Sequence, residues 1–292
     1  MPWGDISESI SSATGAIFRI EQNSAAGGGG INAAHRIDGC GRSYFVKVNS
    51  ADKADMFAAE AEGLREIAAS ATVRVPQPVC LGANRAASWL VMEHIALGRA
   101  RSGGMRELGR QLAALHRVTG GAFGWRRDNT IGSTPQINAQ SGNWMAFWRE
   151  RRLGFQLRRA TANGYRGRLQ RDGEALLEKL PAFFAAHRPQ PALVHGDLWS
   201  GNTGFDEAGN PVIFDPAVYY GDRETDLAMT ELFGGFSADF HAAYREAYPL
   251  DTGYELRKTL YNLYHVLNHL NLFGGGYLGR AERMIGQLLA AA

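Results

Sequence analysis

Oxygen-bearing side chains gather around two short apolar segments in the last third of the chain. The segment LVHGDLWSGNTGF (193–205) contains Asp197 and, five residues later, Asn202. The segment GNPVIFD (209–215) ends in Asp215, directly before a proline that disfavours a helical conformation at this residue. Carboxylate and amide oxygens near two strand ends joined by a hairpin-like turn suit Mg²⁺ beside substrate phosphates. These residues therefore favour metal-assisted chemistry on a phosphate compound.

Two other interpretations use the same residues. Asp197 and Asn202 could cap the backbone of their own turn, which is a purely structural role. The carboxylates of Asp197 and Asp215 are also the residue types that hydrolysis of a glycosidic bond requires. Neither interpretation explains the glycine run 27–30 or Lys47.

Two charged side chains in the first third of the chain are expected on buried faces. Lys47 lies inside the strand-like run YFVKVN (44–49), and Glu60 shares a helix face with Phe57 and Leu64. Each charge either extends to water or meets an opposite charge. Because the two charges can satisfy one another, we expect an ion pair between them, with Lys47 also able to meet a phosphate.

The elements that must position these residues divide the chain at a composition shift in LGRARSGG (97–104). Residues 1–95 are expected to form an antiparallel meander with one helix: the strand patterns lie at 17–20, 31–37, 43–49 and 88–95, and the helix at 53–69. Residues 96–292 are expected to be mainly helical, with strands only in the region 193–215. The leucines of 254–273 recur every three or four residues, which indicates a core helix. The fold class is therefore α+β in two parts.

Composition excludes several other classes of protein. A net charge of +2 gives no field that would favour nucleic acid. We expect the arginines of 149–171 to form a solvated helix face, and a docking surface for an anionic partner is the alternative. Cys40 and Cys80 lack metal-ligand spacing and are too few for a disulfide scaffold. No signal peptide or membrane-length apolar run is present. We expect a cytoplasmic protein with no nucleic-acid or membrane partner, and we favour a monomer.

The order of these features is that of protein-kinase-like phosphotransferases: glycine run, strand lysine, helix glutamate, apolar strand, then Asp-x4-Asn and Asp. Here HGDLWSGN stands in place of HRDxxxxN, so Gly196 replaces the arginine that reads a phosphorylated activation loop in many protein kinases. DPA stands in place of DFG, and no APE-like segment follows. These departures favour a small-molecule acceptor.

Within that branch the chain resembles the fructosamine kinase (ketosamine-3-kinase) family nearly from end to end. The motifs that carry the resemblance include GGGGIN (27–32), YFVKVN (44–49), MFAAEAEGL (56–64), VRVPQPV (73–79), VMEH (91–94), NTIGSTPQIN (129–138), LVHGDLWSGN (193–202) and FDPAVYYGDRETDLAM (214–229). HGDxxxxN alone also matches aminoglycoside phosphotransferases and choline kinases, whereas the combination is far more specific. The glycine loop lacks the cysteine that some relatives carry there, so no redox switch is expected at that position.

The resemblance implies a two-lobed, protein-kinase-like fold and an ATP- and Mg²⁺-dependent kinase. Its substrate would be the 3-hydroxyl of ketosamines, free or on the lysines of glycated proteins. Asp197 would orient or deprotonate that hydroxyl, and Asn202 and Asp215 would hold Mg²⁺. The small N-terminal lobe (1–95) would bind the nucleotide, and the larger lobe (96–292) would supply catalysis and the acceptor site.

The resemblance also assigns roles further from the reaction. Nucleotide contacts are implied for Gly28, Gly29, Gly30, Ile31, Asn32, Lys47, Glu60, Met92, Glu93 and His94. Among these, Lys47 would bind the α and β phosphates, and residues 92–94 would contact adenine through the main chain. Looser candidates for the acceptor side are Trp199, Trp125, Asn129 and Asp222. His195 is expected to orient the catalytic loop and Asp226 to brace it.

Two other functions remain open. One is a kinase of another small hydroxyl compound, such as an aminoglycoside or an amino alcohol. Aminoglycoside enzymes tend to carry acidic clusters, whereas residues 123–160 are aromatic and arginine-rich. The other is a nucleotide-binding pseudokinase, which the joint presence of the lysine, the glutamate and the Asp-x4-Asn and Asp residues disfavours.

Overall fold

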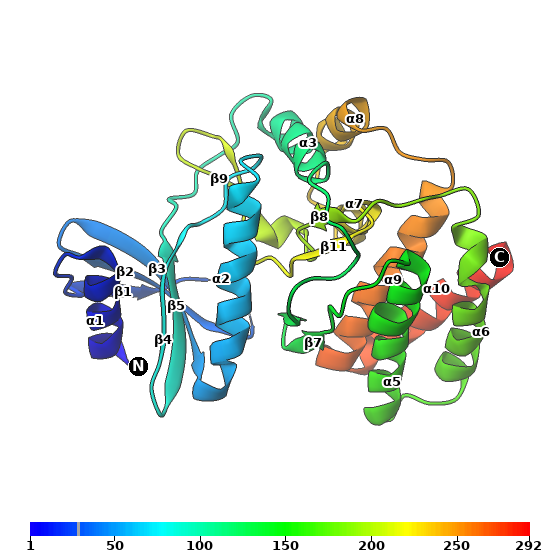
Figure 1. Cartoon of the computed structure of the whole chain (residues 1–292), viewed down its shortest axis with the longest axis horizontal. Coiled ribbons are helices and arrows are strands. Elements are labelled where there is room, and N and C mark those ends of the chain that lie inside the picture. The colour runs from blue at the N-terminus through cyan, green and yellow to red at the C-terminus, as the bar shows by residue number, and fades with distance from the viewer. Residues whose placement is uncertain (28–29) are drawn as a thin grey trace. The chain divides into compact units, whose positions relative to one another are not determined.

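The computed structural model describes residues 1–27 and 30–292, and the chain divides into two compact units (Figure 1). Unit 1 comprises Met1–Leu108 and Gly201–Pro216, and unit 2 comprises Gly109–Ser200 and Ala217–Ala292. The two residues predicted to bind metal, Asn202 and Asp215, therefore belong to unit 1, whereas Asp197 belongs to unit 2. The assignment of nucleotide binding to residues 1–95 and of catalysis to 96–292 stays a prediction.

Unit 1 is built on a five-stranded antiparallel sheet in the order β1-β2-β3-β5-β4. Its strands are β1 (Gln22–Ala25), β2 (Ala33–Gly39), β3 (Arg42–Ser50), β4 (Pro78–Ala83) and β5 (Ala87–Glu93). The predicted strand at 43–49 is the central strand β3. Lys47 pairs there with Ala34 of β2 on one side and with Leu90 of β5 on the other. Its backbone is thereby fixed from both sides.

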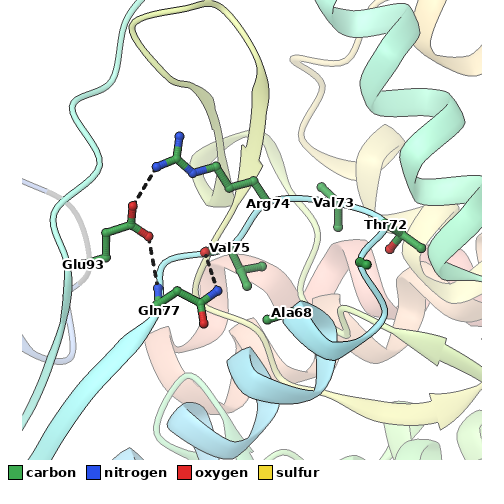
Figure 2. A pocket seen from close by; sticks show the side chains of 8 residues that line it. Ala68, Thr72, Val73, Arg74, Val75, Gln77 and Glu93 are labelled. Carbon is green, nitrogen blue, oxygen red and sulfur yellow. Dashed lines mark hydrogen bonds and ion pairs between the residues drawn. The ribbon is translucent and has the colours of Figure 1, made fainter.

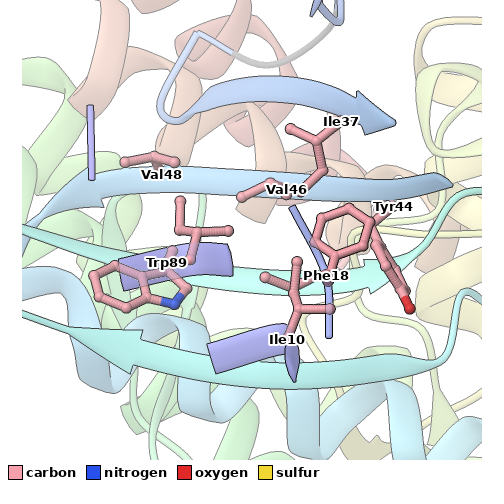
Figure 3. Close-up of a cluster of buried hydrophobic side chains, with 9 residues drawn as sticks. Ile10, Phe18, Ile37, Tyr44, Val46, Val48 and Trp89 are labelled. Carbon is pink, nitrogen blue, oxygen red and sulfur yellow. The ribbon is translucent and has the colours of Figure 1, made fainter. Parts of the chain in front are cut away.

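Two helices cover opposite faces of this sheet, α1 (Trp3–Thr14) on one side and α2 (Ala54–Ala69) on the other (Figure 1). Successive side chains of a strand point to opposite faces. Val46 and Val48 pack with Ile10 of α1 in a buried apolar cluster (Figure 3). Lys47, between the two valines, therefore points to the face covered by α2.

Strands β1 and β4 were not among the expected strand patterns, and the sequence expectations for the first third were wrong at two further places. Only one helix was expected there, yet α1 is a second one. Its polar, serine-rich sequence buries only Ile6 and Ile10, which is too weak a pattern to predict. Residues 17–20 form no strand; the N–H of Phe18 donates instead to Ser11 Oγ at 2.8 Å, and the Phe18 ring enters the cluster between α1 and the sheet.

Unit 2 is mainly helical, as expected. Its helices are α4 (Trp144–Phe147), a π-helical stretch η2 (Trp148–Leu153), α5 (Gly154–Ala162), α6 (Arg168–Phe183), α7 (Glu224–Leu232), α8 (Ala238–Ala247), α9 (Tyr254–Phe273), a short η4 (Gly275–Tyr277) and α10 (Leu278–Ala291), with α3 (Gly104–Leu115) beginning in unit 1. The predicted leucine stripe lies on α9, where Leu260, Leu263, Leu267 and Leu270 are buried. This confirms α9 as a core helix.

Two small antiparallel sheets complete unit 2. They pair β6 (Asn129–Ile131) with β7 (Thr134–Gln136), and β8 (Ala192–Val194) with β11 (Tyr219–Gly221). Strand β8 lies at the edge of the expected strand region 193–215, which also contains β9 (Thr203–Phe205) and β10 (Pro211–Ile213) of unit 1. Strands β6, β7 and β11 lie outside that region and were not expected, because strands of three residues are too short to show a period. Over residues 1–27 and 30–292, we find no helix with the length and apolar character that crossing a bilayer requires.

Candidate active site

Lys47, Glu60 and Asp215 meet in unit 1. The Lys47 ammonium lies 2.5 Å from Glu60 Oε1 and 2.7 Å from Asp215 Oδ1. The Lys47 side chain is 7% exposed and that of Glu60 is 12% exposed, whereas that of Asp215 is 40% exposed. The ion pair expected from the sequence is present, and a second carboxylate that is open to solvent joins it.

The electrostatics of this cluster keep Lys47 charged. Burial alone would lower the pKa of Lys47, but the charges of Glu60 and Asp215 and their hydrogen bonds raise that pKa above its ordinary value. Burial raises the pKa of Glu60, and the Lys47 charge opposes this effect. Two carboxylates facing one ammonium favour a further cation on the exposed side, at Asp215.

A hairpin of β9 (Thr203–Phe205) and β10 (Pro211–Ile213) positions the two residues predicted to bind metal. Asn202 precedes β9 and Asp215 follows β10, so the antiparallel pairing brings them to the same end of the hairpin. The Phe214 N–H donates to the Asn202 carbonyl at 3.0 Å. Asp215 has a φ of 58°, a left-handed conformation that aspartate tolerates better than most residues. The predicted hairpin-like turn is confirmed, and its amide and carboxylate oxygens are ligands that fit Mg²⁺.

The residues expected to cover the phosphates lie in the loop that leads into β2. Gly28 and Gly29 lie outside the described residues. Residues 30–32 form a bend before β2. Asn49 Nδ2 on β3 donates to the Ile31 carbonyl at 3.1 Å and to Asn32 Oδ1 at 2.7 Å. Strand β3 therefore fixes both Lys47 and the end of the glycine loop.

Met92 and Glu93 end strand β5, and His94 follows it. The Glu93 N–H donates to the Gln77 carbonyl at 2.8 Å, so any adenine contact of this stretch falls to other main-chain groups. Burial lowers the pKa of the His94 imidazole. The Glu93 carboxylate accepts a hydrogen bond from Arg74 at 2.7 Å.

In unit 2, the loop that carries Asp197 follows β8 and is held from below by Asp226 of α7. Asp226 Oδ2 accepts the His195 N–H at 2.7 Å, and Oδ1 accepts the Gly196 N–H at 2.8 Å. His116 Nε2 lies 3.1 Å from the same carboxylate. Burial would raise the pKa of Asp226, but these partners lower it below its usual value. The bracing role expected of Asp226 is confirmed.

The residues before Asp197 are constrained by their neighbours. The His195 side chain is fully buried, and its Nδ1 accepts the Asp197 N–H at 3.3 Å, which is the orienting role expected. Gly196 has a φ of 83°, and a Cβ there would lie 2.1 Å from the Ala217 carbonyl oxygen. The Ala217 carbonyl therefore gives a steric reason for glycine at position 196. This reason is separate from the small-molecule acceptor that Gly196 favoured in the sequence.

The four acceptor-side candidates differ in exposure. Trp199 is 38% exposed and contacts the Phe233 ring edge-on, with the ring centroids 6.3 Å apart. Trp125 is buried. Asn129 donates through Nδ2 to the Val218 carbonyl at 2.8 Å, and its oxygen accepts two further hydrogen bonds. Of the four, Trp199 offers an exposed ring, whereas Trp125 and Asn129 support the interior of the unit.

Asp222, the fourth candidate, belongs to a buried charge network that sequence reasoning missed. Its carboxylate lies 2.6 Å from His187 Nε2 and accepts the Tyr261 hydroxyl at 2.5 Å. His187 Nδ1 lies 2.6 Å from Asp251. Asp222 is 1% exposed, so its contacts are structural. No sequence signal joined His187 to Asp222, because they are 35 residues apart and share no element.

The same network has the spacing of a metal site. Ligand atoms of His187, Asp222 and Glu224 all lie within 4.8 Å of one another. However, both nitrogens of His187 already face carboxylates, and Arg257 binds Glu224 with two hydrogen bonds of 2.7 and 2.9 Å. The three side chains therefore form part of an ion-pair network.

Comparison with known proteins agrees with these observations. The family model described as "Fructosamine kinase" matches residues 2–291. A "probable ketoamine kinase" of Synechocystis sp. is 48% identical over 289 residues, covering 99% of this chain and 97% of the relative. A chloroplastic protein-ribulosamine 3-kinase of Arabidopsis thaliana is 42% identical over 278 residues, covering 94% of this chain and 85% of the relative.

Solved structures share the fold. The crystal structure of a "putative fructosamine-3-kinase" from Haemophilus somnus has a TM-score of 0.91 at 28% identity and covers 98% of this chain and 97% of its own. Aminoglycoside phosphotransferases share the fold alone, with a TM-score of 0.62 at 16% identity. The predicted α+β, protein-kinase-like fold is confirmed. The chain belongs to the fructosamine kinase family.

Proposed function

We propose that this chain is an ATP-dependent kinase that transfers the γ-phosphate to the 3-hydroxyl of ketosamines, such as fructosamine and ribulosamine adducts. The observation that carries the proposal is the Lys47 ammonium held between Glu60 and Asp215, in a chain that a fructosamine kinase model matches from residue 2 to 291. A buried lysine whose pKa is raised by its carboxylate partners, beside an exposed carboxylate, suits a nucleotide phosphate and its cation.

The residues of the chain would act mainly by placing charge. Lys47 would neutralise the α and β phosphates, and Glu60 would hold its ammonium in place. Asn202 and Asp215 would hold Mg²⁺, which when bound supplies further neutralisation of phosphate oxygens. Asp197, on the loop braced by Asp226, would accept the proton of the acceptor hydroxyl, a role that typically contributes roughly 10²- to 10⁴-fold to the rate.

On the acceptor side, the exposed Trp199 ring is the candidate for contact with the sugar adduct. An aromatic face at the surface suits both the apolar side of a sugar and a neighbouring amine. Such a contact does not require the amine to be free, so adducts on protein lysines are included in the proposal.

Kinetics on a matched substrate panel test the proposal. The purified chain would be given Mg-ATP with fructose-, ribulose- and erythrulose-derived amines, and phosphorus NMR would locate the new phosphate. We expect at least one ketosamine to be phosphorylated on its 3-oxygen, with no turnover of the matching 3-deoxy adduct. Aminoglycosides and amino alcohols serve as comparison acceptors. Turnover restricted to those acceptors, or none at all with Mg-ATP bound, would refute the ketosamine assignment.

A further inference from the structure

Arg74 joins two functional segments of unit 1. It lies in the loop between α2 and β4, where Nη2 donates to Glu93 Oε1 and Nη1 donates to Asp206 Oδ2, both at 2.7 Å. Glu93 ends strand β5, and Asp206 directly follows β9. Figure 2 shows Arg74 and Glu93 facing one another, with Gln77 on the other side of the Glu93 carboxylate. The three residues line a pocket of about 370 Å³.

The main chain of Arg74 also contacts the hairpin of β9 and β10. The Ile213 N–H donates to the Arg74 carbonyl at 3.0 Å, next to a parallel bridge between Arg74 and Val212. The hairpin is therefore held through its backbone on β10 and through its turn at Asp206. The open end of this hairpin carries Asn202 and Asp215.

Asp206 is itself rigidly placed. Its Oδ1 accepts the Asn210 N–H at 2.9 Å, and its own N–H donates to the Asn210 carbonyl at 2.9 Å. The hydrogen bond from Asn210 and the contact with Arg74 lower the pKa of Asp206, so the carboxylate stays ionised at neutral pH. A planar guanidinium can reach two carboxylates at once in fixed directions, which a lysine ammonium cannot reproduce.

We propose that Arg74 is a positioning residue that couples residues 92–94, at the expected adenine contact, to the hairpin that carries the proposed metal ligands. It thereby sets where Asp215 lies relative to Lys47. The inference rests on the proposed function for the roles of these segments. It goes beyond that function because it assigns a role to a residue that is not among those proposed to bind nucleotide, metal or acceptor.

Three variants separate the two contacts of Arg74. Glu93→Gln weakens the contact with β5 and is expected to raise the KM for ATP and the Kd for Mg-ADP about threefold at unchanged kcat. Asp206→Asn weakens the hairpin contact and is expected to lower kcat about threefold and raise the Mg²⁺ concentration for half-maximal activity. Arg74→Met is expected to show both effects. If Arg74→Met fails to fold, Arg74→Lys provides a milder variant. Its ammonium is expected to keep at most one of the two carboxylate contacts.

A matched control removes another arginine of unit 1. Arg42 donates to the Ile17 carbonyl at 2.8 Å and contacts neither β5 nor the hairpin turn through its guanidinium. Arg42→Met is expected to lower the melting temperature while leaving the ATP KM and the Mg-ADP Kd unchanged. Hydrogen exchange at residues 203–213 is expected to quicken in Arg74→Met and not in Arg42→Met.

The inference is overturned if folded Arg74 variants bind Mg-ADP and exchange their hairpin amides as the unaltered chain does. It is also overturned if Arg74→Met lowers only the apparent kcat, in proportion to the loss of folded protein, while the KM for ATP and the Kd for Mg-ADP stay unchanged. Failure of the proposed function has a different signature: the unaltered chain would turn over no ketosamine. The Mg-ADP titration and the exchange rates would still decide the role of Arg74.

Discussion

At the scale of single residues, the role proposed for Asp197 is the one that most directly distinguishes an enzyme from a nucleotide-binding pseudokinase. Asp197→Asn keeps the size and most hydrogen bonds of the side chain but removes the proton acceptor. We expect kcat to fall by roughly 10²- to 10⁴-fold. Nucleotide affinity is expected to stay unchanged, because Lys47, Glu60 and Asp215 are intact. Steady-state kinetics and a Mg-ADP titration measure the two quantities.

The control for this variant is another carboxylate of unit 2. Asp172 lies on the surface of α6, where it pairs with Arg168 and Arg171. Asp172→Asn is expected to leave kcat unchanged. Comparable turnover in Asp197→Asn and Asp172→Asn would exclude Asp197 as the base.

The buried pair of Lys47 and Glu60 allows a test that separates stability from binding. Lys47→Met leaves the 12%-exposed Glu60 carboxylate without its cation, which we expect to cost about 3 kcal/mol of unfolding free energy. Adding Glu60→Leu removes the stranded charge and is expected to restore most of that stability. Nucleotide affinity is expected to be lost in both variants, because the ammonium is absent from both.

Urea denaturation and a Mg-ADP titration on the single and double variants provide the measurement. Glu60→Leu alone is the reference, since it leaves Lys47 paired with Asp215. If the double variant is as unstable as Lys47→Met, the cost lies in packing rather than in the uncompensated charge.

At the scale of elements, the loop that carries Asp197 depends on a backbone conformation that only glycine fits at position 196. A Cβ on Gly196 would approach the Ala217 carbonyl, which is held by a hydrogen bond from Gln136 Nε2 at 3.0 Å. We expect Gly196→Ala to cost roughly 3 kcal/mol, from the positive φ and the collision together, and to abolish turnover.

Gly15 supplies the matched control. It ends α1 with a φ of 67°, but an added Cβ would meet nothing within 4 Å. Gly15→Ala is therefore expected to cost only about 1 kcal/mol, from the conformation alone, and to spare activity. Thermal unfolding of both variants measures the difference. Equal losses of stability in the two variants would show that the backbone around Ala217 shifts to accommodate the added Cβ at no measurable cost.

Elements with a strong pattern could be predicted from the sequence. The positions of Lys47 and Glu60 followed from the two-residue period of a strand and the 3.6-residue period of a helix, and both face the interior as expected. Helix α1 could not be predicted in the same way, because its sequence is mostly polar or small and only two isoleucines are buried. The helix is stabilised by packing of Ile6 and Ile10 against the sheet.

Contacts between distant segments were beyond the reach of sequence patterns. Asp226 could be assigned to the catalytic loop from the resemblance, but its partner His116 could not. The two hydrogen bonds of Arg74 and the network around His187 join residues from elements and loops that are far apart in the sequence. Their existence depends on tertiary packing, and neither residue lies in a periodic pattern that would mark it.

At the scale of the whole molecule, the pH dependence of stability should reflect the buried network of unit 2. Burial would lower the pKa of His187, but Asp222, Glu224 and Asp251 face it and raise that pKa above 6.5; Arg257 also belongs to the network. His187 therefore contributes its full stabilisation below pH 6.5, and this contribution is lost as the pH rises through the folded-state pKa.

The pKa of Asp222 is lowered by His187 and Tyr261 against the effect of burial. Its contribution is therefore present above pH 3.8 and is lost as the pH falls through its folded value.

His187→Gln is accordingly expected to lower the unfolding free energy by about 3 kcal/mol at pH 6 and by less at pH 9, since the removed charge matters only while it is present. His241 provides a control of opposite sign. Burial lowers its pKa, so the folded chain binds that proton less well, and His241→Gln should remove a destabilisation that appears only at low pH. Urea unfolding between pH 5 and pH 9 measures both slopes. A His187→Gln curve parallel to that of the unaltered chain would mean that His187 is neutral in the folded protein and that Asp222 is held by hydrogen bonds without an imidazolium.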